Sequence, residues 1–176
     1  MGILAARDGK TFDSVKASVP AKGTLQAVFS PWDDVEHVIV DVIDGAKQQI
    51  LVQAYLLTGK KISSALIAAH RRGIEVWILA DAEQDLRNSS SKISSLADAG
   101  IKVWVETKYK NAHNKIILTD VQSVDATVIT GSYNFTWAAQ QKNAENILII
   151  RKNLELAAQY AANWQRHRAD ASPYKK

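Results

Sequence analysis

Apolar and polar positions along the chain follow two periods, one typical of strands and one typical of helices. The stretch 49–57 (QILVQAYLL) is apolar at consecutive positions, as in a strand that is covered on both faces. The stretch 60–73 (KKISSALIAAHRRG) repeats its apolar residues every three to four positions, as an amphipathic helix does. Gly73 and Gly100 follow helical stretches at positions where helices commonly end. The pattern therefore predicts a domain that contains both strands and helices.

In chain order the pattern predicts strands at 24–30, 49–57, 74–81, 101–106, 113–120, 126–132 and 144–151, and helices at 31–48, 60–73, 89–100 and 153–168. Strand and helix alternate up to Glu106 with short connections, which is typical of parallel strands joined by right-handed crossovers. Beyond Glu106 the strands follow one another with little helix between them. We therefore expect an α/β domain at 24–168, with a mixed, largely parallel central β-sheet flanked by helices on both faces. An N-terminal extension (1–23) and a C-terminal tail (169–176) would enclose it.

The composition excludes some classes of functional site but does not identify the function. At 176 residues, 47% of them hydrophobic, the chain can bury a single core. It has no cysteine, which excludes disulfides, thiolate metal sites and cysteine nucleophiles. The net charge of +4 is compatible with a polyanionic partner but does not require one. Residues 1–14 lack the apolar stretch of a signal peptide, so we expect an intracellular protein, or a periplasmic or secreted one if this is a processed form. No run approaches the length of a membrane span, so no stable membrane association is expected.

The candidate chemistry begins with the stretch HNKIILTD at 113–120. His113 and Lys115 stand two apart at the head of a predicted strand, so their side chains project to one face. A group that titrates near neutral pH then lies beside a fixed positive charge. Taken alone, such a triplet is more often a solvent-exposed strand end after a basic loop.

Two later stretches supply what an anion site needs. In GSYN, Gly131 permits close backbone approach, and Ser132 and Asn134, again two apart, offer neutral hydrogen-bond donors to one side. Glu145 stands at the start of a very apolar strand, where a carboxylate must find a partner or stay at the rim. With the histidine and the lysine, these residues predict an anion pocket that contains a potential nucleophile and an orienting carboxylate.

This combination resembles the phospholipase D superfamily, and within it the small bacterial Nuc-type endonucleases. The family motif is H-x-K-x4-D followed by G-S-x-N, and here it is met by His113, Lys115, Asp120, Gly131, Ser132 and Asn134. The similarity runs from about Leu25 to Trp164 and includes a Y-x-x-T at Tyr55 and Thr58. One departure is the segment 121–130, which is a few residues longer than in the shortest members and predicts a longer hairpin turn.

The resemblance also implies how the site works. The chemistry of the family employs two H-x-K-x4-D motifs and this chain has one, so a two-fold homodimer is implied, with both motifs meeting at one site. His113 of one subunit would attack phosphorus and form a phosphohistidine, and His113 of the other would protonate the leaving oxygen. The other implied roles are phosphate binding by Lys115, Ser132 and Asn134, orientation of the imidazole by Glu145, and structural support by Asp120 and Gly131.

No metal and no cofactor are expected. The four histidines form no H-x-H, H-x-x-H or H-E-x-x-H pattern, and no cluster of Asp and Glu has the spacing of a two-metal site.

The expected substrate is nucleic acid. The candidate substrate rim consists of Tyr55, Lys108, Tyr109 and Lys110. Basic and aromatic residues together suit a nucleic-acid backbone, so we expect DNA, with RNA as a further candidate, to be cut without sequence specificity. Arg71 and Arg72 are equally well explained as ordinary surface charge. One alternative is a phospholipid phosphodiesterase, which would need an apolar groove mouth. Another is a catalytically silent dimer that binds nucleic acid.

Overall fold

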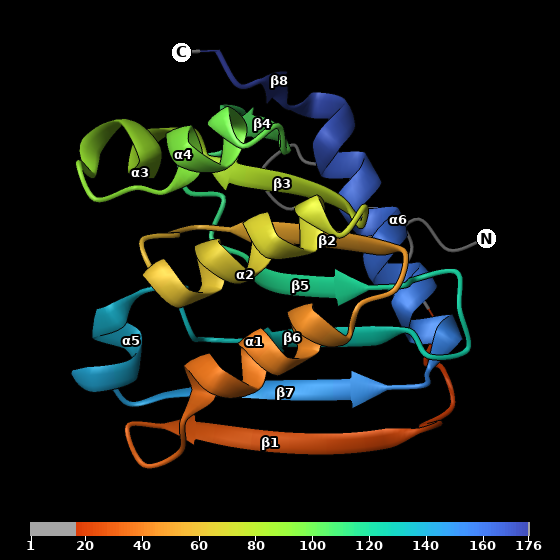
Figure 1. Cartoon of the computed structure of the whole chain (residues 1–176). Coiled ribbons are helices and arrows are strands. Elements are labelled where there is room, and N and C mark those ends of the chain that lie inside the picture. Colours follow the sequence, from red (N-terminus) through yellow and green to blue (C-terminus); the bar gives the residue numbers. More distant parts are fainter. Residues whose placement is uncertain (1–16, 176) are drawn as a thin grey trace, which may run out of the picture.

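The structure, a computed structural model, describes residues 17–175 and is built around an eight-stranded sheet (Figure 1). The strands are β1 (Thr24–Ser30), β2 (Gln49–Ala54), β3 (Glu75–Asp81), β4 (Lys102–Glu106), β5 (Lys115–Thr119), β6 (Thr127–Gly131), β7 (Glu145–Arg151) and β8 (Ser172–Pro173). The helices are α1 (Val35–Gly45), α2 (Lys60–Arg71), α3 (Ala82–Arg87), α4 (Ile93–Asp98), α5 (Trp137–Gln141) and α6 (Leu154–Asp170). Across the sheet the strands lie in the order β1, β7, β6, β5, β2, β3, β4, β8.

The sheet is mixed, as predicted, but the expectation that it is largely parallel is wrong. Only β2, β3 and β4 run parallel to one another, and within residues 17–175 the other neighbouring strands are antiparallel. Parallel neighbours need a crossover, which α2 supplies between β2 and β3, and α3 with α4 supply between β3 and β4. Beyond β4 the connections are short. There β5 and β6 form the predicted hairpin, joined by a turn at 120–126.

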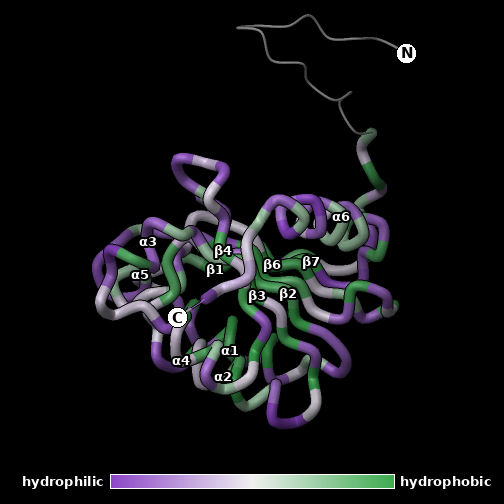
Figure 2. The backbone as a smooth tube through the Cα atoms, turned by 90° about the horizontal axis from the view of Figure 1, so that it is seen from above, coloured by the Kyte–Doolittle hydropathy of each residue, from purple (hydrophilic) through white to green (hydrophobic). Residues whose placement is uncertain are grey.

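Helices cover both faces of the sheet, which confirms the prediction of flanking helices. Figure 2 shows α1 and α2 on one side of the strands and α6 on the other. Ile39 of α1 and Leu66 of α2 are fully buried in the core of the first face. On the second face Leu118 packs with Trp164 of α6, whose Nε1 donates a hydrogen bond to the carbonyl oxygen of Val52 at 2.9 Å. The strands between these layers are therefore apolar on both sides, which explains their consecutive apolar positions.

The sequence pattern did not predict three short elements. The helices α3 and α5 have six and five residues and β8 has two, so none is long enough to show a hydrophobic period. Because β8 pairs with β4, part of the predicted C-terminal tail takes part in the sheet. The predicted N-terminal extension, 1–23, lies outside the described residues as far as residue 16.

Candidate active site

The residues of the sequence motifs lie together at one end of the strands of the sheet. β2 ends there with Ala54, β5 begins with Lys115, β6 ends with Gly131 and β7 begins with Glu145. The register pairs Ala54 with Lys115 across β2 and β5, and Gly131 with Ile147 across β6 and β7. The parallel strands β2, β3 and β4 have their C-terminal ends on this side of the sheet. In α/β proteins, ligands commonly bind at the C-terminal ends of the parallel strands. Strand pairing thus brings stretches that are far apart in the sequence to one place.

Lys115 is a buried cation held by neutral groups. Its residue is 6% exposed, and its Nζ donates a hydrogen bond to the carbonyl oxygen of His113 at 2.9 Å. The same nitrogen lies 4.7 Å from the centre of the Tyr55 ring, within the range of a cation–π contact. Burial lowers the pKa of Lys115 to about 8, and attraction to Glu145 only partly opposes this shift. The negative charge of a bound anion would therefore offset the energetic cost of burying the ammonium group.

His113 is exposed and lies against Tyr55. The centroids of the two rings are 4.4 Å apart, and the ring planes are tilted by 58°. Tyr55 also donates a hydrogen bond from its hydroxyl to Oδ1 of Asn111, at 3.3 Å. Tyr55 was predicted as a rim residue, whereas the structure places it against both the candidate nucleophile and the candidate phosphate-binding lysine.

Asp81 positions the segment before His113, and sequence reasoning missed it. Its carboxylate is buried at the end of β3 and accepts hydrogen bonds from the backbone N–H of Ala112 at 2.7 Å and of Gln84 at 2.9 Å. The signal that could have found it is an acidic residue closing a very apolar strand, because such a carboxylate needs partners.

The GSYN stretch forms the other side of the site. A Cβ on Gly131 would lie 2.2 Å from the carbonyl oxygen of Asn146, so only glycine fits between β6 and β7 there. Ser132 is exposed, and its Oγ accepts a hydrogen bond from the backbone N–H of Asn146 at 3.1 Å. The Oδ1 atom of Asn134 is buried and has no hydrogen-bond partner among the described residues. Unsatisfied buried polar groups are rare, and they are often explained by a ligand or a catalytic role.

Glu145 interacts with the charge of Lys115, and its side chain accepts a hydrogen bond from a neighbouring asparagine. Its Oε1 accepts a hydrogen bond from Nδ2 of Asn143 at 2.8 Å, and its charge raises the pKa of Lys115 against the effect of burial. In the described part of the chain no hydrogen bond joins Glu145 to the imidazole of His113. Orientation of the histidine by Glu145 therefore stays a prediction.

Asp120 lies at the opposite end of β5 from His113. Its carboxylate is buried and accepts hydrogen bonds from three successive backbone N–H groups, those of Lys47, Gln48 and Gln49, at distances between 2.7 and 3.2 Å. These bonds hold the connection between α1 and β2 against the end of β5. Such contacts agree with the supporting role expected of this residue.

Replacing Asp120 by Asn should destabilise the fold while leaving the chemistry of folded molecules nearly unchanged. The amide cannot accept three N–H groups as a carboxylate does, and we expect a loss of roughly 1–3 kcal/mol in the free energy of unfolding. Urea unfolding measures this loss. Asp125→Asn is the matched control, because Asp125 is in the same turn and its ion pairs with Lys47 and Lys152 are at the surface. Equal stability of the two variants would contradict the structural role.

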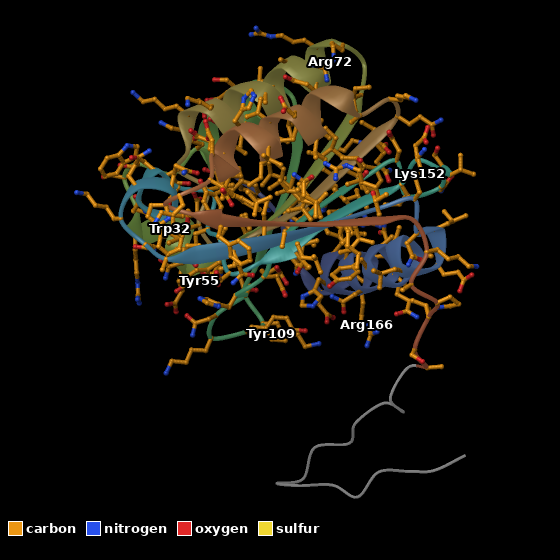
Figure 3. The ribbon with its side chains drawn as sticks, turned by 90° about the horizontal axis from the view of Figure 1, so that it is seen from below. Trp32, Tyr55, Arg72, Tyr109, Lys152 and Arg166 are labelled. Atoms are coloured by element: carbon orange, nitrogen blue, oxygen red, sulfur yellow. The ribbon has the colours of Figure 1, made fainter. Side chains whose placement is uncertain are left out.

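The predicted rim is only partly available to a substrate. Nζ of Lys108 is paired with Oδ2 of Asp170 at 2.6 Å, which raises the pKa of the lysine, and Tyr109 packs on the ring of His167 of α6. Lys110 is exposed. Figure 3 shows Tyr55 and Tyr109 on one side of the molecule and Arg72 on the other.

The side chain of Arg72 is bound to the end of a neighbouring helix. Its guanidinium donates to the carbonyl oxygens of Ile43 and Asp44 at the end of α1. This favours the explanation of Arg72 as ordinary surface charge.

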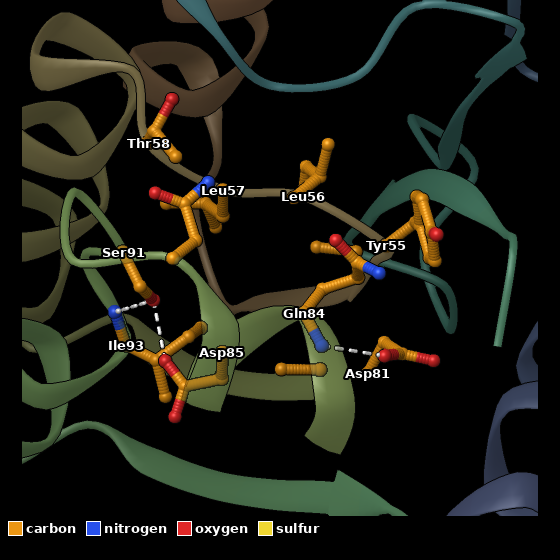
Figure 4. A pocket seen from close by; sticks show the side chains of 12 residues that line it. Tyr55, Leu56, Leu57, Thr58, Asp81, Gln84, Asp85, Ser91 and Ile93 are labelled. Atoms are coloured by element: carbon orange, nitrogen blue, oxygen red, sulfur yellow. Dashed lines mark hydrogen bonds between the residues drawn. The ribbon is translucent and has the colours of Figure 1, made fainter. Parts of the chain in front are cut away.

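A pocket borders the site behind Tyr55 (Figure 4). It is lined by Ala54, Tyr55, Leu56, Leu57, Thr58, Ala80, Asp81, Gln84, Asp85, Asn88, Ser91 and Ile93. Asp85 accepts a hydrogen bond from the hydroxyl of Ser91, and Figure 4 shows the side-chain amide of Gln84 beside Tyr55. The pocket thus combines apolar side chains with two amides, Gln84 and Asn88, and two carboxylates, Asp81 and Asp85.

Two general features concern metals and membranes. Within residues 17–175, no three side chains of His, Asp or Glu gather as a metal site would require. No helix in this part of the chain combines the length and the hydrophobicity that crossing a bilayer demands.

Comparison with known proteins identifies the family. Residues 39–168 match the family model described as cardiolipin synthase, PLD-like domain. A protein named phospholipase D from Rickettsia bellii is 38% identical over 149 residues, which cover 85% of this chain and 71% of that protein. A mitochondrial cardiolipin hydrolase from Xenopus laevis is 30% identical over 105 residues, covering 60% of this chain and 48% of that protein.

A solved structure has the same architecture. The crystal structure of Nuc, a phospholipase D family member from Salmonella typhimurium, superposes with a TM-score of 0.80 at 32% sequence identity, covering 88% of this chain and 100% of that one. The family match, the fold, and the position of the H-x-K and G-S-x-N motifs together at one end of the strands all point to the same family. The chain therefore belongs to the phospholipase D superfamily and is a phosphodiester hydrolase.

Proposed function

We propose that this phosphodiesterase is an endonuclease, which cuts DNA, and RNA as a further candidate, without sequence specificity and without a metal ion. The observation that carries the proposal is the juxtaposition of an exposed imidazole, His113, with a buried ammonium group, Lys115, against one tyrosine ring. A neutral imidazole is a suitable nucleophile for a singly charged phosphodiester when a nearby cation offsets the phosphate charge. The likeness to Nuc over its whole length supports the nuclease assignment.

The reaction proceeds in two steps. A ring nitrogen of His113 from one subunit bonds to phosphorus, and the bond from phosphorus to the leaving oxygen breaks, while His113 of the other subunit gives its proton to that oxygen. The second histidine, now neutral, takes a proton from water as the water attacks phosphorus and releases the first histidine. Lys115, with the Asn134 amide, stabilises the charge on the phosphate oxygens in both steps.

The site requires two copies of the chain. The sequence contains one H-x-K-x4-D motif, and the two-step reaction needs one nucleophilic histidine and one acidic histidine at the same phosphate. A two-fold dimer supplies both, because a residue near the axis meets its own copy.

Exposed aromatic and basic side chains favour nucleic acid as the substrate. Trp137, three residues after Asn134, is 62% exposed, and Nζ of Lys142 lies 5.7 Å from the centre of its ring. A ring that can stack on a base, next to a cation that can contact a phosphate, suits a nucleic-acid strand. The second candidate is a phospholipid phosphodiester, favoured by the names of the Rickettsia and Xenopus relatives.

A direct comparison of substrates, each with and without excess EDTA, tests the proposal. Purified protein is incubated with plasmid DNA, single-stranded DNA, RNA and phospholipid vesicles. We expect nucleic acid to be degraded at the same rate with EDTA, because attack by histidine needs no metal-bound water. Loss of cleavage in EDTA that added Mg²⁺ restores would overturn the histidine mechanism. Release of lipid headgroups without cleavage of nucleic acid would establish the second candidate instead.

A further inference from the structure

The loop 107–114 connects β4 to the H-x-K motif and carries His113. Among the described residues, no hydrogen bond between backbone groups involves residues 108–111. Near the end of the loop, the backbone N–H of Ala112 donates to the buried carboxylate of Asp81. The middle of the loop therefore depends on side-chain contacts for its position.

Two side-chain contacts join this loop to the last turn of α6. Nζ of Lys108 and Oδ2 of Asp170 are 2.6 Å apart. The ring centroids of Tyr109 and His167 are 5.3 Å apart, on the side of the molecule where Figure 3 also shows Tyr55. We refer to the contacts Lys108–Asp170 and Tyr109–His167 as the α6 clamp.

A buried carboxylate holds His167 in place. Nδ1 of His167 lies 2.5 Å from Oε1 of Glu106, which is the last residue of β4 and is 3% exposed. Nε2 of Gln53, a fully buried residue of β2, donates a hydrogen bond to Oε2 of the same carboxylate at 3.1 Å. A buried carboxylate requires such partners. Neither Glu106 nor His167 takes part in the proposed reaction, so this buried polar cluster needs a different explanation.

The end of α6 is firmly attached to the sheet. Nε1 of Trp164 is bonded to the carbonyl oxygen of Val52. The guanidinium carbon of Arg168 lies 5.6 Å from the ring centre of Trp77 and 5.4 Å from that of Trp104, within the range of cation–π contacts. Directly after the helix, β8 pairs with β4. The α6 clamp therefore ties the loop to a fixed part of the fold.

We propose that the α6 clamp sets the position of the loop 107–114, and that His167 and Asp170 are positioning residues for His113. The inference rests on the catalytic role of His113 in the proposed function and adds residues that act through the loop. Misplacing a reacting group by about 1 Å can lower a rate about 10²-fold, so contacts with a neighbouring helix can affect the chemistry.

Replacing Asp170 by Lys separates the clamp from substrate binding. Two ammonium groups then lie together and should loosen the loop, although a lysine suits both a helix C-terminus and a polyanionic substrate. We expect kcat to fall roughly three- to tenfold, the size of an exposed ion pair turned into a repulsion, while KM does not rise. The decrease should be equal for plasmid DNA and for bis(p-nitrophenyl) phosphate, a diester with no chain that could extend along the loop. Adding Lys108→Glu to this variant reverses the ion pair and should restore kcat.

Glu155→Lys is the matched control for this substitution. Glu155 lies in the first turn of the same helix and forms an exposed ion pair with Lys22 at 2.5 Å. The control thus makes the same change of charge at the opposite end of α6, and kcat should stay unchanged. A lower KM for Asp170→Lys with an unchanged kcat would mean that Lys108 contacts the substrate, and would overturn the clamp.

A double-mutant cycle tests the ring contact. Tyr109→Leu and His167→Asn each remove one ring, and the asparagine amide can still donate to Glu106. We expect each single variant to lower kcat roughly three- to tenfold. The double variant should be no slower than the slower single variant, because both substitutions remove the same contact. Additive losses together with a raised KM would mean that Tyr109 contacts the substrate, and would overturn the role of His167.

Exchange of the Ala112 amide hydrogen with solvent, followed by NMR, measures the clamp without any substrate. This hydrogen is bonded to the buried Asp81 and exchanges only when the end of the loop opens. We expect exchange to be roughly three- to tenfold faster in Asp170→Lys and unchanged in Glu155→Lys. Unchanged exchange in both variants would overturn the clamp. Cleavage of the synthetic diester but not of DNA would overturn the nuclease proposal and leave the clamp standing.

Discussion

Mixing His113→Ala chains with wild-type chains should inactivate the wild-type chains as well. If both histidines act on one phosphate, a heterodimer lacks either the nucleophile or the acid and is inactive. At equal amounts and after full exchange, only wild-type homodimers remain active, so the activity should fall to about a quarter of that of the same total amount of wild-type chain. Independent sites would retain about half. The rate of DNA cleavage, measured against the fraction of variant chain, distinguishes a quadratic from a linear decrease.

The control for this experiment is a variant altered away from the site. Val124→Glu chains mixed with wild type in the same way should leave the activity unchanged, which shows that exchange itself is harmless. A linear decrease with His113→Ala, under conditions where labelled chains demonstrably exchange, would contradict the shared site.

Replacing Lys115 by Met should change activity and stability in opposite directions. The variant loses the cation that stabilises charge on the phosphate oxygens, and we expect the cleavage rate to fall by roughly 10²–10³-fold. The same change removes a buried ammonium group whose lowered pKa shows that its charge is unfavourable in the folded protein. We therefore expect the free energy of unfolding to rise by roughly 1–3 kcal/mol at pH 7. Lys60→Met, at an exposed position, is the matched control and should show neither effect.

The pH dependence gives this prediction a second measurement. In the folded protein the pKa of Lys115 is about 8, against 10.5 in the unfolded chain, so between these values the unfolded chain binds more protons. The contribution of Lys115 to the free energy of unfolding therefore increases with pH between about 8 and 10.5, and the Met variant should lack this increase. The value of kcat/KM should decrease above about pH 8, because the free enzyme then loses the ammonium charge. A wild type no less stable than its Met variant at pH 7 would contradict the assigned cost of burial.

The sequence spacing identifies the candidate residues, but it does not give their exact placement. His113 and Lys115 stand two apart, as do Ser132 and Asn134, yet β5 begins only at Lys115 and β6 ends at Gly131, so alternation along a strand does not by itself place either pair. The short turn after Asp120 is enough to predict the antiparallel hairpin of β5 and β6, but the antiparallel pairing of β5 with β2 joins strands far apart in the sequence, and no local pattern contains that information. The roles of Tyr55 and Asp81 were missed for the same reason, because their contacts with His113 and Ala112 arise only when β2, β3 and β5 are aligned.

The two ends of β5 make this strand intolerant of changes in length. Lys115 at its start serves the candidate active site, and Asp120 directly after its end binds the backbone of 47–49. Since side chains alternate, inserting or deleting one residue within 116–119 would turn one of these two side chains to the wrong face. In the turn at 120–126, no residue after Asp120 has to keep a fixed distance from the candidate active site. We therefore expect this turn to tolerate insertions and deletions. The four residues between Lys and Asp in H-x-K-x4-D therefore correspond to the length of strand that separates Lys115 in the candidate active site from Asp120 at the opposite end of the sheet.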